Sequence, residues 1–250
     1  MSRCWLTGAS SGLGAALAQA LLEQGHQVAL GGRRSQALLP LAERYPGQVL
    51  LAEGDIADAA QVAQMAARIE QAWGGLDMAV FNAGTCEYLE PGHFDPALVE
   101  RVVRTNLLGV SNCLAAALPL LRAGVRPHLV VVGSSVTWLA LPRAGAYGAS
   151  KAAVRYLVES QLIDLAREGI DVTLVSPGFV DTPLTRRNDF PMPQLWSAER
   201  AAQHIAKRLP RRPLEINFPS LFTWGLRVLG ALPPRLRLAL GLRLARHEQD

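Results

Sequence analysis

Short apolar runs alternate along the chain with longer segments in which apolar residues recur every three or four positions. The runs are predicted strands and lie at residues 3–7, 27–31, 48–52, 77–81, 128–133 and 171–175. Runs such as Leu129 to Val132 show no alternation of apolar and polar residues, as expected for parallel strands covered on both faces. The pattern predicts an α/β fold: a Rossmann-like, doubly wound parallel sheet with helices on both faces.

The chain is long enough for one domain of this kind. It has 250 residues, half of them hydrophobic, and no internal repeat or inter-domain linker interrupts the alternation. Proline and arginine become dense only from about residue 183. We therefore expect one α/β domain over residues 1–218, a loop or lid over 183–199 within it, and a C-terminal helical extension over 219–250.

The first predicted strand runs into a glycine-rich turn and then a helix. The turn reads Thr7-Gly8-Ala9-Ser10-Ser11-Gly12-Leu13-Gly14. Glycine lets the backbone turn tightly and approach a pyrophosphate, and the N–H groups at a helix N-terminus favour negative charge. The turn therefore predicts a site for the phosphates of a dinucleotide.

The same turn also fits the nucleophile elbow of serine hydrolases, with Ser10 at its centre. A hydrolase needs a histidine and an acid later in the chain, and neither His204 nor His247 follows a clear strand. A serine hydrolase is therefore the weaker alternative.

Several further motifs follow in order: Asp55-Ile56 after the third strand, Asn82-Ala83-Gly84 after the fourth, Asn106 in the next helix, Ser134 after the fifth, Tyr147-Gly148-Ala149-Ser150-Lys151, and Pro177-Gly178 after the sixth. With the T-G-x-x-x-G-x-G turn, this order over about residues 1–183 resembles the short-chain dehydrogenase/reductase family. The resemblance implies a hydride-transferring oxidoreductase.

The resemblance also implies where a nicotinamide cofactor lies. Asp55 would contact the adenine ring, Asn82-Ala83-Gly84 would support the central strand, and Pro177-Gly178 with Thr182 would bracket the nicotinamide. The other residues expected at the cofactor are Gly8, Ser10, Ser11, Gly12, Leu13, Gly14, Ile56, Tyr147, Lys151 and Val180.

The end of the second strand indicates which nicotinamide cofactor is used. An acidic residue there would bind the ribose 2′-hydroxyl of NAD, but this strand ends in Gly31-Gly32-Arg33-Arg34. Guanidinium groups suit a 2′-phosphate. The sequence therefore predicts NADP(H), held by Arg33 and Arg34, with Arg33 favoured by the family resemblance. The alternative is that both arginines begin a solvated helix.

Tyr147 and Lys151 have the spacing of an acid and the charge that tunes it. Reducing a carbonyl requires a proton donor, and a lysine four residues further along a helix lies on the same face as the tyrosine. Its positive charge is expected to lower the pKa of the tyrosine. The chain has 25 lysines and arginines but only two lysines, Lys151 and Lys207, so a lysine at this position is informative.

Ser134 ends the fifth strand, at the sheet edge where ligands bind, and is predicted to hydrogen bond the substrate oxygen. Ser135 is the competing candidate, but the family spacing of 13 residues from serine to tyrosine selects Ser134. The resemblance adds Asn106, whose helix would hold a water linking Lys151 to solvent. These four residues, Asn106, Ser134, Tyr147 and Lys151, form the predicted catalytic group.

The remaining expectations concern partners and location. Residues 200–250 carry ten Lys and Arg against three Asp and Glu, but no nucleic-acid-binding pattern accompanies them, so we expect no nucleic acid partner. The three cysteines lack metal-ligand or disulfide spacing, which predicts no metal and a reducing cytoplasm. The resemblance implies a homodimer through helices around 96–122 and 147–168.

The C-terminal extension is unusually apolar and basic. In 221–232 most positions are apolar, and only Thr223, Arg227 and Gly230 form a narrow non-apolar stripe. The run is too short to span a bilayer, and arginines follow it. Residues 219–246 are therefore expected either to contact a membrane surface peripherally or to pack on the protein itself or a second subunit.

The substrate loops are expected at 85–95, 136–145 and 183–199. They contain Tyr88, Leu89, Trp138, Leu139, Leu141, Phe190, Met192, Leu195 and Trp196, a lining that favours an apolar or lipid-like carbonyl or alcohol. A protein that binds NADP(H) only as a sensor is the remaining alternative, but it would not need a tuned acid.

Overall fold

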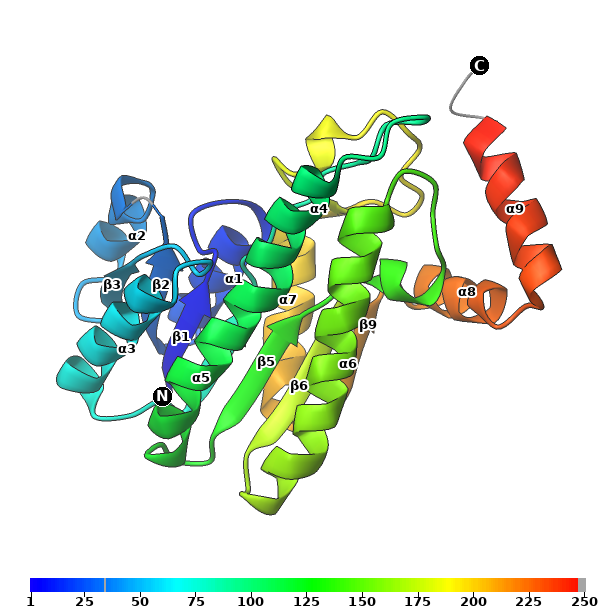
Figure 1. Ribbon diagram of the computed structural model, residues 1–250. Coiled ribbons are helices and arrows are strands. Elements are labelled where there is room, and N and C mark those ends of the chain that lie inside the picture. The colour runs from blue at the N-terminus through cyan, green and yellow to red at the C-terminus, as the bar shows by residue number, and fades with distance from the viewer. Residues whose placement is uncertain (34, 247–250) are drawn as a thin grey trace.

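Seven parallel strands form the central sheet of the computed structural model, which describes residues 1–33 and 35–246 (Figure 1). Their order across the sheet is β3 (Val49–Glu53), β2 (Gln27–Gly32), β1 (Arg3–Thr7), β4 (Met78–Phe81), β5 (His128–Val132), β6 (Asp171–Pro177) and β9 (Glu215–Phe218). Six of these strands lie within two residues of the predicted apolar runs. The predicted doubly wound, Rossmann-like fold is confirmed.

Helices cover both faces of the sheet. Successive residues of each strand point to opposite sides, so each strand contributes side chains to the core on either face. Leu6 belongs to the core under α1 (Gly12–Glu23) and α7 (Ala198–Arg208), whereas its neighbour Trp5 belongs to the core under α3 (Ala59–Trp73), α5 (Gly109–Arg122) and α6 (Gly145–Arg167). The remaining elements are α2 (Leu39–Arg44), α4 (Pro96–Val103), α8 (Ser220–Gly230), α9 (Pro234–Arg246), the strand pair β7 (Val180–Asp181) and β8 (Trp196–Ser197), and short helical turns at Ser35–Ala37, Arg104–Leu108, Ser135–Trp138, Thr185–Arg187 and Leu209–Arg211.

The strand order reverses between β1 and β4, and this reversal positions the site. Chain connections leave β1 toward β2 on one side and leave β4 toward β5 on the other. A crevice therefore opens at the carboxyl ends of these two strands, where ligands of doubly wound sheets bind. The glycine-rich turn follows β1 directly, and Asn82 follows β4.

The seventh strand, β9, was absent from the strands that the sequence predicts. It is only four residues long and lies at the sheet edge, where only β6 pairs with it. Its sequence, Glu-Ile-Asn-Phe, has two apolar residues that are buried and two polar residues that are half-buried. A segment so short and polar acquires strand structure from its pairing with β6, which a local pattern does not reveal.

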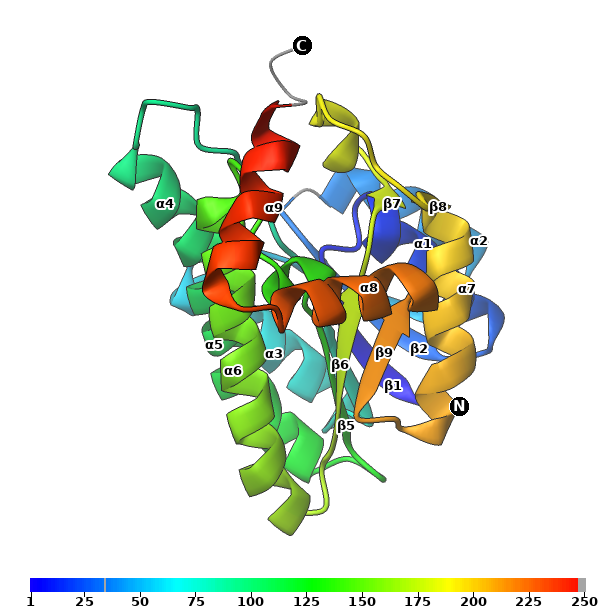
Figure 2. The same ribbon diagram turned by 90° about the vertical axis from the view of Figure 1, so that its right-hand side faces the viewer.

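Beyond β9 the chain forms α8 and α9, which lie outside the layers that cover the sheet (Figures 1 and 2). The orientation of α8 was unexpected. Thr223 of the narrow stripe is buried, and a Cβ on Gly230 would lie 1.9 Å from the Trp138 carbonyl oxygen. The stripe therefore packs against the protein, whereas Leu221 and Trp224 are exposed. Within residues 1–33 and 35–246, no helix combines the length and apolar character that crossing a membrane requires.

Candidate active site

The glycine-rich turn is held against β4 by close backbone contacts. Gly8 has a φ of +71°, and a Cβ there would lie 2.7 Å from the Cα of Ala83. A Cβ on Gly14 would lie 2.0 Å from the carbonyl oxygen of Gly8. The side-chain amide of Asn82 donates to the carbonyl oxygens of Thr7 and Gly8, each at 3.3 Å. Only glycine fits at these positions, and Asn82 ties the end of β4 to the glycine-rich turn.

A cleft of about 680 Å³ opens above this turn. Ser11, the residue before α1, makes no side-chain cap, so the first N–H groups of α1 have no partner from that side chain. A glycine cradle and a helix N-terminus fit the pyrophosphate of a dinucleotide. The predicted residues that line the cleft are Gly8, Ser10, Ser11, Gly12, Leu13, Gly14, Arg33, Asp55, Ile56, Asn82, Ala83, Gly84, Ser134, Tyr147, Lys151, Pro177, Gly178, Val180 and Thr182.

Arg33 and Asp55 lie together where β2 and β3 end. The Arg33 guanidinium is 4.0 Å from the Asp55 carboxylate, and its side chain is 79% exposed. Asp55 also accepts a hydrogen bond from the Ala57 N–H at 2.9 Å, which orients its carboxylate. Arg33 therefore has the reach to contact an anion at this end of the cleft. Arg34, the second predicted arginine, lies outside the described residues.

Tyr147 and Lys151 lie one turn apart on α6, and both line the cleft beside Ser134. The Lys151 amine donates to the carbonyl oxygen of Val132 at 2.8 Å. The hydroxyl of Ser134 hydrogen bonds with that of Tyr147 and accepts the Val136 N–H at 3.2 Å. Ser135 is buried and is not among the residues that line the cleft. The structure thus brings Ser134, rather than Ser135, to Tyr147.

The electrostatics of this group differ from the sequence expectation. Burial raises the pKa of Tyr147, and the hydrogen bond from Ser134 only partly opposes it. The same burial lowers the pKa of Lys151 to about 8. The expectation that the lysine charge lowers the pKa of Tyr147 is therefore wrong for the chain without a bound cofactor. Low-dielectric surroundings disfavour the charged form of the tyrosine and also that of the lysine.

Asn106 is placed behind the cleft rather than in it. It lies in a π turn, Arg104–Leu108, and is fully buried. Its side-chain oxygen accepts the Thr85 N–H at 2.8 Å, and its amide donates to Thr85 O and to the Ser150 hydroxyl, each at 2.9 Å. A Cβ on Gly84 would lie 3.1 Å from the Asn106 oxygen and 3.5 Å from the Lys151 amine. Asn106 is therefore close to Lys151, and its side chain orders the loop after β4.

A row of aromatic rings lies next to Gly178, at one side of the cleft. Tyr88 packs edge-on against Phe190 with ring centroids 5.5 Å apart, Phe190 against Phe179 at 6.1 Å, and Phe179 against Phe222 at 5.6 Å. A Cβ on Gly178, which lines the cleft, would lie 2.9 Å from the ring of Phe222. We call these four residues the aromatic row. Phe179 and Phe222 were missed because neither lies in a predicted substrate loop.

Two tryptophans that the sequence assigned to the substrate loops pack elsewhere. Trp196 stacks on Phe218 with centroids 5.1 Å apart. The guanidinium groups of Arg155 and Arg227 both lie over the Trp138 ring, at 5.5 and 4.4 Å from its centroid. Both are used to join elements of the fold, so neither contributes to the aromatic row.

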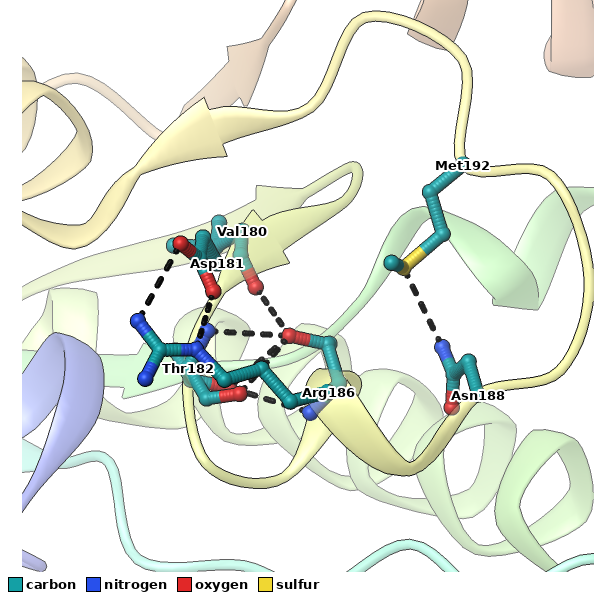
Figure 3. Close-up of polar contacts among 7 residues, drawn as sticks. Val180, Asp181, Thr182, Arg186, Asn188 and Met192 are labelled. Atoms are coloured by element: carbon teal, nitrogen blue, oxygen red, sulfur yellow. Dashed lines mark hydrogen bonds and ion pairs between the residues drawn. The ribbon is translucent and has the colours of Figure 1, made fainter.

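The loop after β7 is tied to its own start and to the other substrate loops. Arg186 pairs with Asp181 at 2.8 Å, and Asn188 donates to the sulfur of Met192 (Figure 3). Arg143, from the loop before α6, donates to both carboxylate oxygens of Asp189 at 2.8 Å and pairs with Glu90 at 3.3 Å. The three predicted substrate loops therefore meet at Arg143.

Thr85, Glu87, Pro183, Leu184, Thr185 and Arg187 also line the cleft and belong to the predicted substrate loops. The lining residues that sequence reasoning did not assign to the site are Gly31, Gly32, Gly54, Arg101, Thr105, Val132 and Gly133. Gly54 and Gly133 follow strand ends directly, so the rule that ligands bind at the carboxyl ends of parallel strands would have found them. No local signal marks Arg101 or Thr105, which the fold of distant segments brings to the cleft.

The arrangement around His204 argues against a serine hydrolase. Its ring packs on Trp196 and Phe218, with centroids 5.0 Å away in each case, and Nδ1 lies 3.0 Å from Arg208. No hydrogen bond joins it to Ser10 among the described residues. His247 lies outside the described residues.

Comparison with known proteins identifies relatives over nearly the whole chain. The profile of the short chain dehydrogenase family matches residues 3–191. An uncharacterized oxidoreductase of Myxococcus xanthus is 35% identical over 242 residues, which cover 96% of each chain. An NADP-dependent 3-hydroxy acid dehydrogenase of Salmonella typhi is 35% identical over 181 residues, covering 70% of this chain and 71% of the relative.

Solved structures have the same fold with either cofactor. A short chain dehydrogenase from Burkholderia cenocepacia in complex with NADP has a TM-score of 0.82 and 28% identity, with 97% of each chain covered. A short chain dehydrogenase/reductase from Burkholderia phymatum in complex with NAD also has a TM-score of 0.82, with 90% and 91% of the two chains covered, but at 22% identity it shows the fold alone.

Proposed function

Because the chain belongs to the short-chain dehydrogenase/reductase family, we propose that it is an NADP(H)-dependent oxidoreductase that interconverts a carbonyl and an alcohol. The observation that carries this proposal is the meeting of Ser134, Tyr147 and Lys151 in the same cleft as the glycine-rich turn. A sensor that only bound the dinucleotide would have no use for a hydrogen-bonded acid at this place.

The catalytic residues act on the oxygen of the substrate. A bound NADPH supplies the hydride. The Tyr147 hydroxyl donates the proton to the carbonyl oxygen, and Ser134 holds that oxygen by a hydrogen bond. The Lys151 ammonium favours the phenolate as the proton leaves. Asn106 orders the loop beside Lys151, where we propose that a water bound at the π turn returns the proton from solvent.

The preference for NADP(H) rests on Arg33, on the absence of an acidic residue at the end of β2, and on the NADP dependence of the Salmonella relative. Arg33→Ala is expected to weaken NADPH binding about tenfold to a hundredfold, the range of a hydrogen bond to a charged group, and to leave NADH binding unchanged. Fluorescence titration measures both affinities. Arg167→Ala, which removes an exposed arginine from the end of α6, is the control. Equal losses for NADPH and NADH would show that Arg33 does not read the 2′-phosphate.

The rate of reduction is expected to depend on the protonation of Lys151. Its pKa of about 8 means that the ammonium is present below that pH and is lost as the pH rises through it. The kcat/KM for carbonyl reduction should therefore fall above about pH 8, while Tyr147, whose pKa is raised, keeps its proton. A pH profile of kcat/KM at saturating NADPH measures this decrease. A profile that stays flat well above pH 8 would contradict it.

The substrate is proposed to be an apolar or lipid-like carbonyl compound or alcohol. The aromatic row places apolar rings next to Gly178, and apolar surroundings favour apolar groups. Oxidation of NADPH at 340 nm, followed over a panel of apolar and charged ketones and aldehydes, tests this proposal together with the reaction class. Dinucleotide binding without turnover of any substrate would favour the sensor.

The chain is further proposed to form a homodimer in the cytoplasm. Tyr156 and Ile163 are exposed apolar side chains on α6, one of the two family dimer helices, and light scattering would give the mass in solution. Cys4, Cys86 and Cys113 are all free thiols, which suits a reducing compartment.

A further inference from the structure

The C-terminal helices α8 and α9 place large apolar side chains in solvent. Leu221 and Trp224 of α8 are 73% and 64% exposed. On α9 the exposed apolar residues are Leu236, Leu238, Leu242 and Leu244. We call these six residues, with Val228, the exposed apolar set. Large apolar side chains exposed together on two adjacent short helices mark an interaction surface.

The charge of the same helices is of one sign. Residues 219–246 contain five arginines and no aspartate or glutamate. Arg227 pairs with Glu215, on β9. In the described part of the chain, no carboxylate pairs with Arg235, Arg237 or Arg243, and all three are exposed. Within the described residues, the surface therefore combines apolar groups with positive charges that no carboxylate offsets.

We propose that α8 and α9 attach the protein to the surface of a membrane that contains anionic lipids. On α9 the exposed leucines lie next to the exposed Arg235, Arg237 and Arg243, so the helix presents apolar and basic side chains to solvent together. In the headgroup region this mixture is favourable, because leucines enter the acyl boundary while the long arginine side chains reach up to phosphates. The exposed Trp224 suits the same layer, where tryptophan is enriched.

A second copy of the chain fits this surface less well than a lipid. In a twofold symmetric dimer the same patch meets itself. Arg235, Arg237 and Arg243 would then face the same residues of the partner without any acidic residue of α8 or α9 to offset them. An anionic lipid surface supplies the missing negative charge.

The orientation of the attached protein follows from the position of α9. Ala245, near its end, lines a cavity of about 620 Å³ together with Leu89, Leu141 and Pro142 of the substrate loops. Figures 1 and 2 show α9 standing apart from the helices that cover the sheet, connected to the body through α8. Attachment through α8 and α9 therefore brings the substrate loops to the lipid surface.

The test is sedimentation of the full chain with vesicles. Binding is expected to vesicles of phosphatidylcholine mixed with phosphatidylglycerol, to fall with added salt, and to be absent with phosphatidylcholine alone. Arg235→Gln/Arg237→Gln/Arg243→Gln should weaken it on the order of a hundredfold. Leu221→Ser/Trp224→Ser/Leu238→Ser should also lose binding. The control Arg167→Gln/Lys207→Gln/Arg211→Gln removes the same charge from exposed positions elsewhere and should bind as the wild type does.

NADPH titration without vesicles checks that each variant is folded and separates this proposal from the proposed enzyme activity. Equal binding of the wild type and the arginine variant would overturn the proposal, as would no binding to anionic vesicles. A third result would also overturn the proposal: the wild type does not bind vesicles, and Leu221→Ser/Trp224→Ser/Leu238→Ser changes the sedimentation mass from dimer to monomer. The surface would then join two copies of the chain.

Discussion

Replacing Tyr147 with phenylalanine is expected to lower turnover by about 10²- to 10⁴-fold while leaving NADPH affinity close to that of the wild type, because the substitution removes only a general acid. Ser134 would keep its position, since its hydroxyl is also held by the Val136 N–H. Steady-state kinetics on the best carbonyl substrate, with NADPH titration alongside, measures both quantities.

Tyr156 provides a matched control on the same helix. Its side chain is 78% exposed and does not line the cleft, so Tyr156→Phe should retain full activity. If Tyr147→Phe kept a turnover near that of the wild type, the proton would come from another group. Tyr88, close enough to Tyr147 for that residue to raise the pKa of Tyr88, would be the first to test.

The sheet could be predicted from sequence because its signal is local. Each predicted strand is a largely apolar run followed by a turn or helix, and the motifs at Gly8, Asp55, Asn82, Ser134 and Pro177 lie at or just after strand ends. Parallel strands then bring their carboxyl ends to one edge, so the order of the motifs already implied the cleft. Ser134 reaches that edge because it follows β5, whereas Tyr147 reaches the same cleft on α6.

The parts that the sequence did not reveal depend on contacts between distant segments. β9 is a strand because β6 pairs with it. Phe179 lies between β6 and β7 and Phe222 lies on α8, so they meet only when α8 packs across the sheet edge. α8 itself turns its narrow stripe inward because Gly230 lets the helix approach the carbonyl of Trp138.

The pKa of Tyr147 also depends on burial, which spacing along a helix cannot show. The four-residue separation correctly placed Lys151 one turn away, but the sign of the net shift depends on how much water the folded chain excludes. In the proposed reaction the tyrosine therefore acts chiefly as an acid that keeps its proton until the carbonyl oxygen gains negative charge.

Gly14→Ala is expected to abolish dinucleotide binding and to destabilise the fold by about 1–3 kcal/mol, the cost of overpacking a well-packed site. The added methyl would lie 2.0 Å from the Gly8 carbonyl oxygen and 2.5 Å from the Asn82 amide nitrogen, so the glycine-rich turn must move away from α1. Thermal unfolding and NADPH titration measure the two effects.

Gly225→Ala is the matched substitution in another helix. No atom lies within 4 Å of a Cβ at Gly225, so the same change should leave NADPH binding intact and stabilise α8 by up to about 1 kcal/mol. Wild-type NADPH affinity in Gly14→Ala would show that the turn has room to shift without loss of the phosphate site. In that case the close packing of Gly8 and Gly14 would serve the fold rather than the cofactor.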